Sequence, residues 1–101
     1  RTLDYKEVVM HIVVEHRIID LDKFSSMDAA EVAGGGGPGF KLRQFLPPQD
    51  GSVATCLWEA DSIDSLQEWL DPATAGVTEN TYIAIDDENA IGLPEAAAAG
   101  A

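Results

Sequence analysis

The feature that most constrains the fold of this chain is an apolar run near its N-terminus. Residues 8–18 read Val-Val-Met-His-Ile-Val-Val-Glu-His-Arg-Ile, and apolar, often β-branched side chains dominate both strand faces until Glu15. A strand that is apolar on both faces is typical of the centre of a sheet that is covered on both sides. The chain is therefore predicted to build a sheet around this segment.

A helix is predicted directly after this strand. Asp20 is a good helix N-cap, and the apolar spacing that follows it predicts a helix over residues 20–33. Ser25, with an acidic residue three positions later, offers a second start, so the helix is expected to break near this point.

The rest of the chain alternates between strand and helix signals. In residues 52–60 the alternation places Ala54, Cys56 and Trp58 on one face, and Val53, Thr55, Leu57 and Glu59 on the other. Ser62 caps a second helix, which Pro72 and Gly76 are expected to end. The remaining predicted elements are strands over 40–46, 52–60 and 81–86 and a helix over 62–70.

The order of these elements predicts an α+β fold. It is a ferredoxin-like βαββαβ domain over residues 1–94, in which a four-stranded antiparallel sheet carries two helices on one face. Residues 95–101 are rich in Ala and have nothing large to bury, so a frayed tail is expected there. The other sheet face is also apolar along two strands. A second copy of the sheet is the expected cover, which predicts a homodimer.

The net charge of the chain restricts the classes of partner that it is expected to bind. Six Lys and Arg residues face eighteen Asp and Glu residues, for a net charge of -12, and no basic residue follows Arg43. Phosphate backbones and anionic lipid headgroups bind through charge neutralisation, so neither nucleic acid nor a membrane is an expected partner. The acidity fits either a solubilising surface or a face that attracts a cation or a basic partner.

The compartment is constrained by a single cysteine. Cys56 has no partner for an intramolecular disulfide or a Cys-based zinc cluster, which fits the cytoplasm or another reducing soluble compartment. The chain starts at Arg1 rather than Met. We therefore expect a truncated or processed N-terminus, and whether a targeting peptide precedes it stays open.

Several short segments together resemble a known family. They are His11-Ile-Val-Val-Glu15, Pro38-Gly39-Phe40, Cys56-Leu-Trp-Glu-Ala60 and Ser62-Ile-Asp-Ser-Leu66. Over about residues 7–92 the chain resembles the dimeric α/β-barrel superfamily, in which two such sheets pack face to face. It is also similar to an uncharacterised subgroup with some nickel-binding members. Cyclases and haem-degrading relatives carry a histidine near the end of the second helix, and residues 69–74 have none, so that chemistry is not expected.

The glycine run matches a nucleotide-binding pattern, but its position between predicted elements does not fit such a site. Gly34, Gly36 and Gly39 have the spacing of a dinucleotide-binding loop, but they follow a predicted helix and precede a predicted strand. Pyrophosphate binding requires the reverse order, because the amides at a helix N-terminus hold the anion. A flexible connection is the better interpretation, and no cofactor is expected.

Metal binding depends on residues from several strands. His11 and His16 are five residues apart on one strand, so they point to opposite faces and cannot chelate one ion. A metal set, if one forms, starts from His11 and Cys56, and a dimer or a carboxylate such as Glu15 would have to complete it. The acidic residues 86–89 lack the spacing of a calcium loop and are predicted to form a solvated turn.

The predicted ligand site lies on the sheet face that would line the barrel. The resemblance places His11 on the same face as Cys56 and Trp58, whereas His16 on the other face is expected to matter little to a ligand. The candidate ligand-binding residues are His11, Val13, Glu15, Cys56, Trp58 and Tyr82. They form an apolar wall with a few polar groups, which suits either a small-molecule pocket or a packed dimer core.

Three functions follow from this site, and whether the chain is an enzyme stays open. The first is a homodimer that binds a small apolar or aromatic ligand between its two sheets. The second is a cofactor-independent monooxygenase or isomerase that uses His11 as its acid–base group, because histidine titrates near neutral pH. The third is a nickel-type metal-binding protein.

Overall fold

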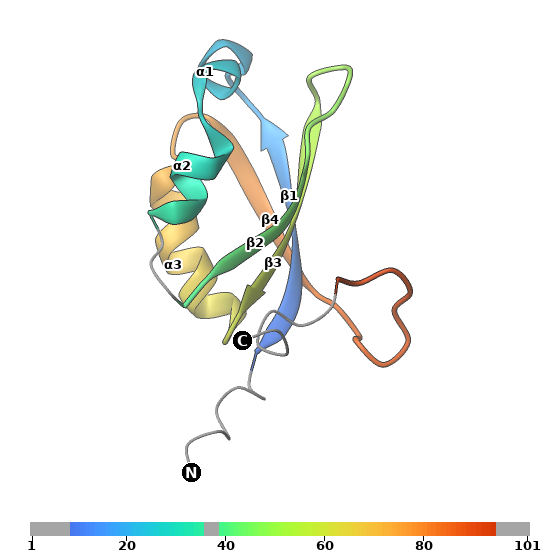
Figure 1. Cartoon of the computed structure of the whole chain (residues 1–101). Coiled ribbons are helices and arrows are strands. Elements are labelled where there is room, and N and C mark those ends of the chain that lie inside the picture. Colours follow the sequence, from blue (N-terminus) through green and yellow to red (C-terminus); the bar gives the residue numbers. More distant parts are fainter. Residues whose placement is uncertain (1–8, 36–38, 95–101) are drawn as a thin grey trace.

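A computed structural model of this chain describes residues 9–35 and 39–94 (Figure 1). In chain order its elements are β1 (Met10–Ile18), α1 (Leu21–Ser26), α2 (Ala29–Gly34), β2 (Lys41–Leu46), β3 (Val53–Ala60), α3 (Ile63–Ala73) and β4 (Thr78–Ala84). The predicted frayed tail over residues 95–101 lies outside the described residues, as does part of the glycine run. The predicted domain boundary at residue 94 stays a prediction.

The four strands form one antiparallel sheet in the order β2-β3-β1-β4. β1 lies in the interior of the sheet between β3 and β4, as its apolar sequence predicted, and β2 and β4 form the two edges. The α+β class and the four-stranded antiparallel sheet are confirmed. The arrangement is compatible with a ferredoxin-like fold.

The segment predicted as one helix forms two short helices. Asp20 caps α1 as predicted, by accepting a backbone hydrogen bond at 3.0 Å. The hydroxyl of Ser26 donates to a carbonyl one turn earlier at 2.8 Å, and Met27 is extended, so α1 ends here. Asp28 then caps α2 with its side chain. The predicted break near Ser25 is therefore confirmed, but the cap of the second helix is Asp28 and not Ser25 as predicted.

The lengths of α3 and β4 also differ from the prediction. Ser62 caps α3 as predicted, with its Oγ accepting a backbone hydrogen bond at 3.1 Å. The helix passes Pro72 and ends at Ala73, because a proline in the last turn removes only one N–H from the helix. Gly76, with a φ of 78°, turns the chain. β4 begins at Thr78, three residues before the predicted start.

The two faces of the sheet have different surroundings. Alternate residues of the two inner strands pack with α3 to form the buried core, which contains Ile12, Val14, Cys56, Trp58, Ala60, Leu66 and Leu70. Val32 and Ala33 of α2 pack against the same core. We call this side of the sheet the covered face and the other side the open face. The chain after β4 lies on the opposite side of the sheet from α3 (Figure 1).

A β-bulge in β2 changes which of its residues reach the core. The pairing of β2 with β3 shifts between Leu42 and Gln44, which makes Arg43 the extra residue. Leu42 lies opposite Trp58, and Phe45 lies opposite a core cysteine. Both side chains therefore share the covered face although they are three residues apart.

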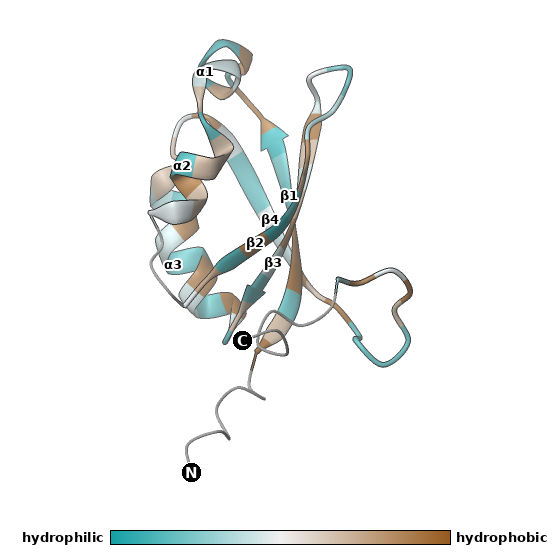
Figure 2. Cartoon of the chain, in the orientation of Figure 1, coloured by the Kyte–Doolittle hydropathy of each residue, from teal (hydrophilic) through white to brown (hydrophobic). Residues whose placement is uncertain are grey.

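The hydropathy of the chain follows this layering. Hydrophilic and hydrophobic residues alternate along the strands and helices, while the β2–β3 turn and the acidic turn after β4 are hydrophilic (Figure 2). Within residues 9–35 and 39–94, no helix has the length and apolar character needed to cross a bilayer.

Candidate functional site

An apolar pocket lies between the covered face and the residues of α1 and α2. It has a volume of about 60 Å³ and opens to the surface. Its floor is formed by the buried residues His16, Cys56, Trp58 and Leu70, and its rim by the more exposed residues Phe24, Met27 and Phe45. We call this space the helix–sheet pocket.

Aromatic rings frame the helix–sheet pocket. The rings of Phe24 and Phe45 lie across its rim with centroids 6.2 Å apart. Below them, the ring of Trp58 makes an edge contact with Trp69 at 5.5 Å. The Nε1–H of Trp58 is buried and has no acceptor among the described residues. Buried donors without an acceptor are rare, because each one has lost its hydrogen bond to water.

The polar part of the floor is a hydrogen-bonded network around His16. His16 is only 6% exposed, and its Nδ1 lies 2.7 Å from Oδ1 of Asn80. The Nδ2 of Asn80 donates to Oδ1 of Asp71 at 2.9 Å, and the hydroxyl of Tyr82 donates to the same oxygen at 2.7 Å. The network thus ties β1 and β4 to the last turns of α3.

The protonation states of this network follow from burial and hydrogen bonding. Burial lowers the pKa of His16, although the bond to Asn80 and the charge of Asp71 oppose this. Burial favours the neutral form of Asp71, but hydrogen bonds from Tyr82 and Asn80 lower its pKa overall. Burial, with Asp71 as the acceptor, raises the pKa of Tyr82. At neutral pH the network therefore holds a neutral imidazole, a carboxylate and a phenol.

Cys56 lies in the same pocket as His16, but its environment does not activate it. Burial raises the pKa of Cys56 to about 12, so the side chain is a neutral thiol at physiological pH. The thiolate is the reactive form of cysteine. Cys56 is therefore a packing residue of the pocket floor rather than a nucleophile.

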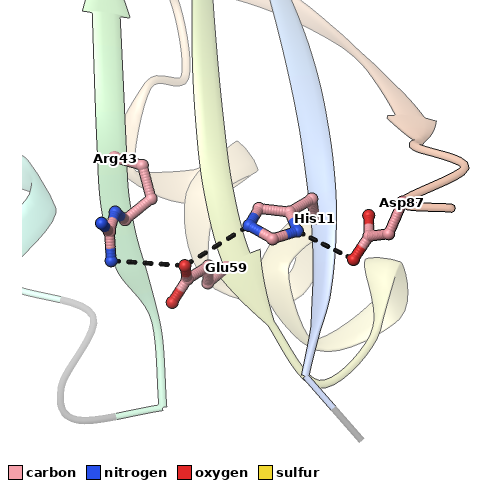
Figure 3. Close-up of polar contacts among 4 residues, drawn as sticks. All are labelled: His11, Arg43, Glu59 and Asp87. Carbon is pink, nitrogen blue, oxygen red and sulfur yellow. Dashed lines mark hydrogen bonds and ion pairs between the residues drawn. The ribbon is translucent and has the colours of Figure 1, made fainter. Parts of the chain in front are cut away.

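A second cluster of polar side chains lies on the open face (Figure 3). Nδ1 of His11 lies 2.9 Å from Oδ2 of Asp87, and its Nε2 lies 3.4 Å from Oε2 of Glu59. Nη1 of Arg43 lies 3.3 Å from the same Glu59 oxygen. The two contacts of Glu59 are ion-pair distances without hydrogen-bond geometry. We call these four residues the His11 cluster; it connects β2, β3 and β1 to the turn after β4.

The structure does not bring the six predicted ligand residues together. Directly opposed residues of paired strands share a face, and His11 lies opposite Glu59, whereas Val14 lies opposite Cys56 and Ile12 opposite Trp58. His11, Val13 and Glu15 are therefore on the open face, and Cys56, Trp58 and Tyr82 are on the covered face. The assumption that His11 shares the face of Cys56 is wrong, because it came from the resemblance and not from the strand register.

The same register separates the predicted metal ligands. His11 and Glu15 lie on one side of the sheet and Cys56 on the other, so one chain cannot close that set around an ion. In the part of the chain that the structure describes, no group of three or more His, Cys, Asp or Glu side chains is arranged to hold a metal ion.

Sequence reasoning missed the main polar group of the pocket. It predicted that His16 contributes little to ligand binding, and it did not single out Asn80 or Asp71. A signal was present in β1, where His16 alternates with Ile12 and Val14 while the other face of the strand carries charged residues. That alternation is typical of a histidine on the core side of its strand.

Comparisons with known proteins identify no relative of this chain. No family model, no curated protein and no solved structure matches it. The functional argument therefore depends on the geometry alone.

Proposed function

We propose that this protein binds a small, mainly apolar molecule in the helix–sheet pocket and that it acts as a homodimer. The observation that carries the proposal is the pocket itself, with its buried, largely apolar floor and its half-exposed aromatic rim. Ligand sites are mostly apolar concave surfaces in which a few polar groups fix the orientation. A volume of about 60 Å³ has room for roughly four to six water-sized groups, which is the scale of a single ring.

This proposal moves the ligand from between two sheets to beneath the helices. Cys56 and Trp58, which were predicted to contact the ligand, line the helix–sheet pocket, and His16 takes the place that was predicted for His11. The open-face residues His11, Val13 and Glu15 then belong to the surface that meets the second copy.

The ligand proposal is tested with benzene as the probe and a variant that fills the pocket. Ala29 lines the pocket, so Ala29→Phe should occupy it; Ala30→Phe, on the adjacent exposed position of α2, is the matched control. In amide NMR spectra, benzene should cause saturable shifts around Trp58 in the wild type and in Ala30→Phe, and none in Ala29→Phe. Shifts that persist in Ala29→Phe, or that map elsewhere, would refute the site.

The homodimer is supported by the distribution of charge on the strands. Six Asp, Glu, Lys or Arg residues lie in the strands and all of them are on the open face: Glu15, Arg17, Lys41, Arg43, Glu59 and Glu79. Three are basic and three are acidic, so the strands give this face no net charge, while the chain as a whole carries -12. Asp87, from the turn after β4, adds one acidic residue to this face. A two-fold axis can place the unlike charges of two copies opposite one another.

Apolar residues on the same face support the same partner. Val53 is 39% exposed and Ile83 is 41% exposed, and the buried Leu57 lies on the same strand as Val53. Leu46, on the same face of edge strand β2, is more than half exposed. Pairing through this face is the arrangement of the dimeric α/β barrels that the sequence resembles. In the ferredoxin-like description that we propose, α1 and α2 form the first crossover and α3 the second, all over the covered face.

The oligomeric state is measured by sedimentation equilibrium at micromolar concentration. The wild type should sediment at about twice 10.8 kDa. Ile83→Lys adds an unpaired charge to the open face and should give a monomer, whereas Leu21→Lys, at a similarly exposed position on α1, should leave the dimer intact. A monomeric wild type, or equal dissociation by both variants, would contradict the proposed interface.

The two alternative functions receive less support from the geometry. Both ring nitrogens of His11 face carboxylates of the chain itself, and His11 is only 8% exposed, so neither nitrogen is placed to exchange a proton with a substrate. The nickel-type site would need His11 and Cys56 on one face, which the register does not give.

A further inference from the structure

The hydrogen-bonded network behind the helix–sheet pocket determines which atom of His16 is offered to a ligand. The starting point is Asp71, whose carboxylate can only accept hydrogen bonds. Because Oδ1 of Asp71 lies 2.9 Å from the side-chain amide of Asn80, that contact must be the Nδ2 donor of Asn80. Nδ2 also donates to Oγ1 of Thr74 at 2.9 Å. The carbonyl Oδ1 of Asn80 is therefore turned toward His16.

This orientation fixes the tautomer of His16. The hydroxyl of Thr78 donates to Oδ1 of Asn80 at 2.7 Å, which agrees with Oδ1 as an acceptor. Nδ1 of His16, also 2.7 Å from this oxygen, must then carry a proton. A neutral imidazole carries only one N–H, so Nε2 presents a lone pair. Burial lowers the pKa of His16, which keeps the ring neutral at physiological pH.

The remaining polar groups that line the pocket either have hydrogen-bond partners within the chain or are free to bind a ligand. The hydroxyl of Thr74 donates to the carbonyl of Leu70, and that of Thr78 is used by Asn80, so neither needs a ligand. Nε2 of His16 has no hydrogen-bonding partner among the described residues, and the buried Nε1–H of Trp58 has no acceptor there. The lining thus contains one unused acceptor and one unused donor.

The unused acceptor defines a ligand class. Resting on the proposed ligand pocket, we propose that this site selects a neutral aromatic alcohol of single-ring size, whose hydroxyl donates to Nε2 of His16. A ring without a donor leaves His16 unpaired and should therefore bind more weakly, by the worth of about one hydrogen bond. No Lys or Arg lines the pocket and Asp71 lies behind His16, so a carboxylate of the same size is disfavoured.

Phenol and toluene test this selection, because they are nearly the same size and differ in the hydroxyl. NMR titrations give the dissociation constants of phenol and toluene, and their ratio is the readout. Comparing this ratio between wild type and His16→Leu removes the effect of the different hydrophobicity of the two ligands. We expect the preference for phenol to fall about tenfold in His16→Leu, the worth of about one hydrogen bond. His16→Gln, which keeps an acceptor, should retain part of the preference, and His11→Gln on the open face should retain all of it.

Acidification gives a second test that needs no variant. Protonation turns Nε2 of His16 into a donor, so the affinity for phenol should fall once the pH drops below the pKa of His16, which burial places under the ordinary value of 6.5, while the affinity for toluene should change less. The titratable groups that face His16 are Asp71 of α3, Cys56 of β3 and Tyr82 of β4. None of them changes charge in step with His16, because the pKa of Asp71 is lowered below the ordinary carboxyl range and the pKa values of Cys56 and Tyr82 are raised.

The outcomes separate this inference from the proposed function. If both rings bind in the pocket and their ratio is the same in wild type and His16→Leu, the pocket stands and the selection by His16 is refuted. If benzene, toluene and phenol all fail to bind the wild type, the proposed function itself is refuted. Tighter binding of benzoate than of phenol would also overturn the ligand class.

Discussion

The two faces of the sheet solve the problem of buried polar groups in different ways. The strands contribute no Asp, Glu, Lys or Arg to the covered face, and its one histidine is held by a hydrogen-bonded network that ends at Asp71. The open face carries all six charged residues of the strands, in equal numbers of each sign, with apolar residues between them. The proposed ligand site therefore lies on the face without charged strand residues, and the proposed dimer interface lies on the face that carries them.

The largest expected difference between the faces is in packing energy. Leu66 of α3 is fully buried in the core, whereas Ile83 on the open face is 41% exposed. Leu66→Ala should lower the free energy of unfolding by about 2–5 kcal/mol, because it removes buried contacts and leaves a cavity. Ile83→Ala should cost less than about 1 kcal/mol in the monomer. Urea unfolding of both variants measures the loss of unfolding free energy. Equal losses at high dilution would show that the two faces do not differ in packing energy.

The next effect lies within the open face itself. Glu59 has a side chain that is 9% exposed between His11 and Arg43, whereas Glu79 pairs with Arg17 at the surface. Glu59→Gln should cost about 1–3 kcal/mol, because it removes a largely buried carboxylate that lies within ion-pair distance of His11 and Arg43. Glu79→Gln should cost at most about 1 kcal/mol, as exposed ion pairs do. If thermal unfolding shows Glu79→Gln to be the more damaging, the His11 cluster does not stabilise the fold.

A smaller effect sharpens the comparison through pH. The pKa of folded His16 lies below the ordinary value of 6.5, because burial disfavours the imidazolium. Below pH 6.5 the unfolded chain therefore binds more protons than the folded chain, and the free energy of unfolding falls as the pH is lowered toward the folded pKa. His16→Gln should remove this part of the acid sensitivity. An identical pH dependence in wild type and His16→Gln, measured by urea unfolding from pH 7 to pH 5, would contradict it.

The smallest expected signal is binding to nucleic acid. The basic residues of the open face each lie beside a carboxylate across the strands: Arg17 pairs with Glu79, Arg43 contacts Glu59, and Lys41 lies opposite Glu59. Phosphate contacts need cations that are free to neutralise the backbone. A gel shift with a generic duplex at physiological salt should show no retention at micromolar protein, and clear retention would mean that the face is not charge-balanced.

Much of the fold could be predicted from patterns within single segments. The apolar run around Ile12 and Val14 predicted an inner strand, and Asp20 and Ser62 were correctly identified as helix caps. The alternation in residues 52–60 correctly separated Cys56 and Trp58 from their neighbours. These features depend on interactions between residues close in sequence, so the residue order determines them directly.

The candidate site depended on contacts between distant segments. Alternation gives the two faces of β1 and of β3 separately, but only the pairing of His11 with Glu59 and of Val14 with Cys56 shows which faces coincide. A shift of one residue in register would exchange the faces, and the sequence contains no local term that fixes it. The bulge at Arg43 has the same origin, because it is a feature of the pairing of β2 with β3.

The sequence by itself therefore determined a central apolar strand, an antiparallel α+β sheet, an acidic chain and two histidines on opposite faces. The tertiary structure decided which histidine lies in the pocket. His16 is joined to Asn80, 64 positions later in the chain, and His11 to Asp87, 76 positions later. Contacts over such separations form only when register and helix packing are complete, so the chemistry of each histidine belongs to the folded chain and not to its local sequence.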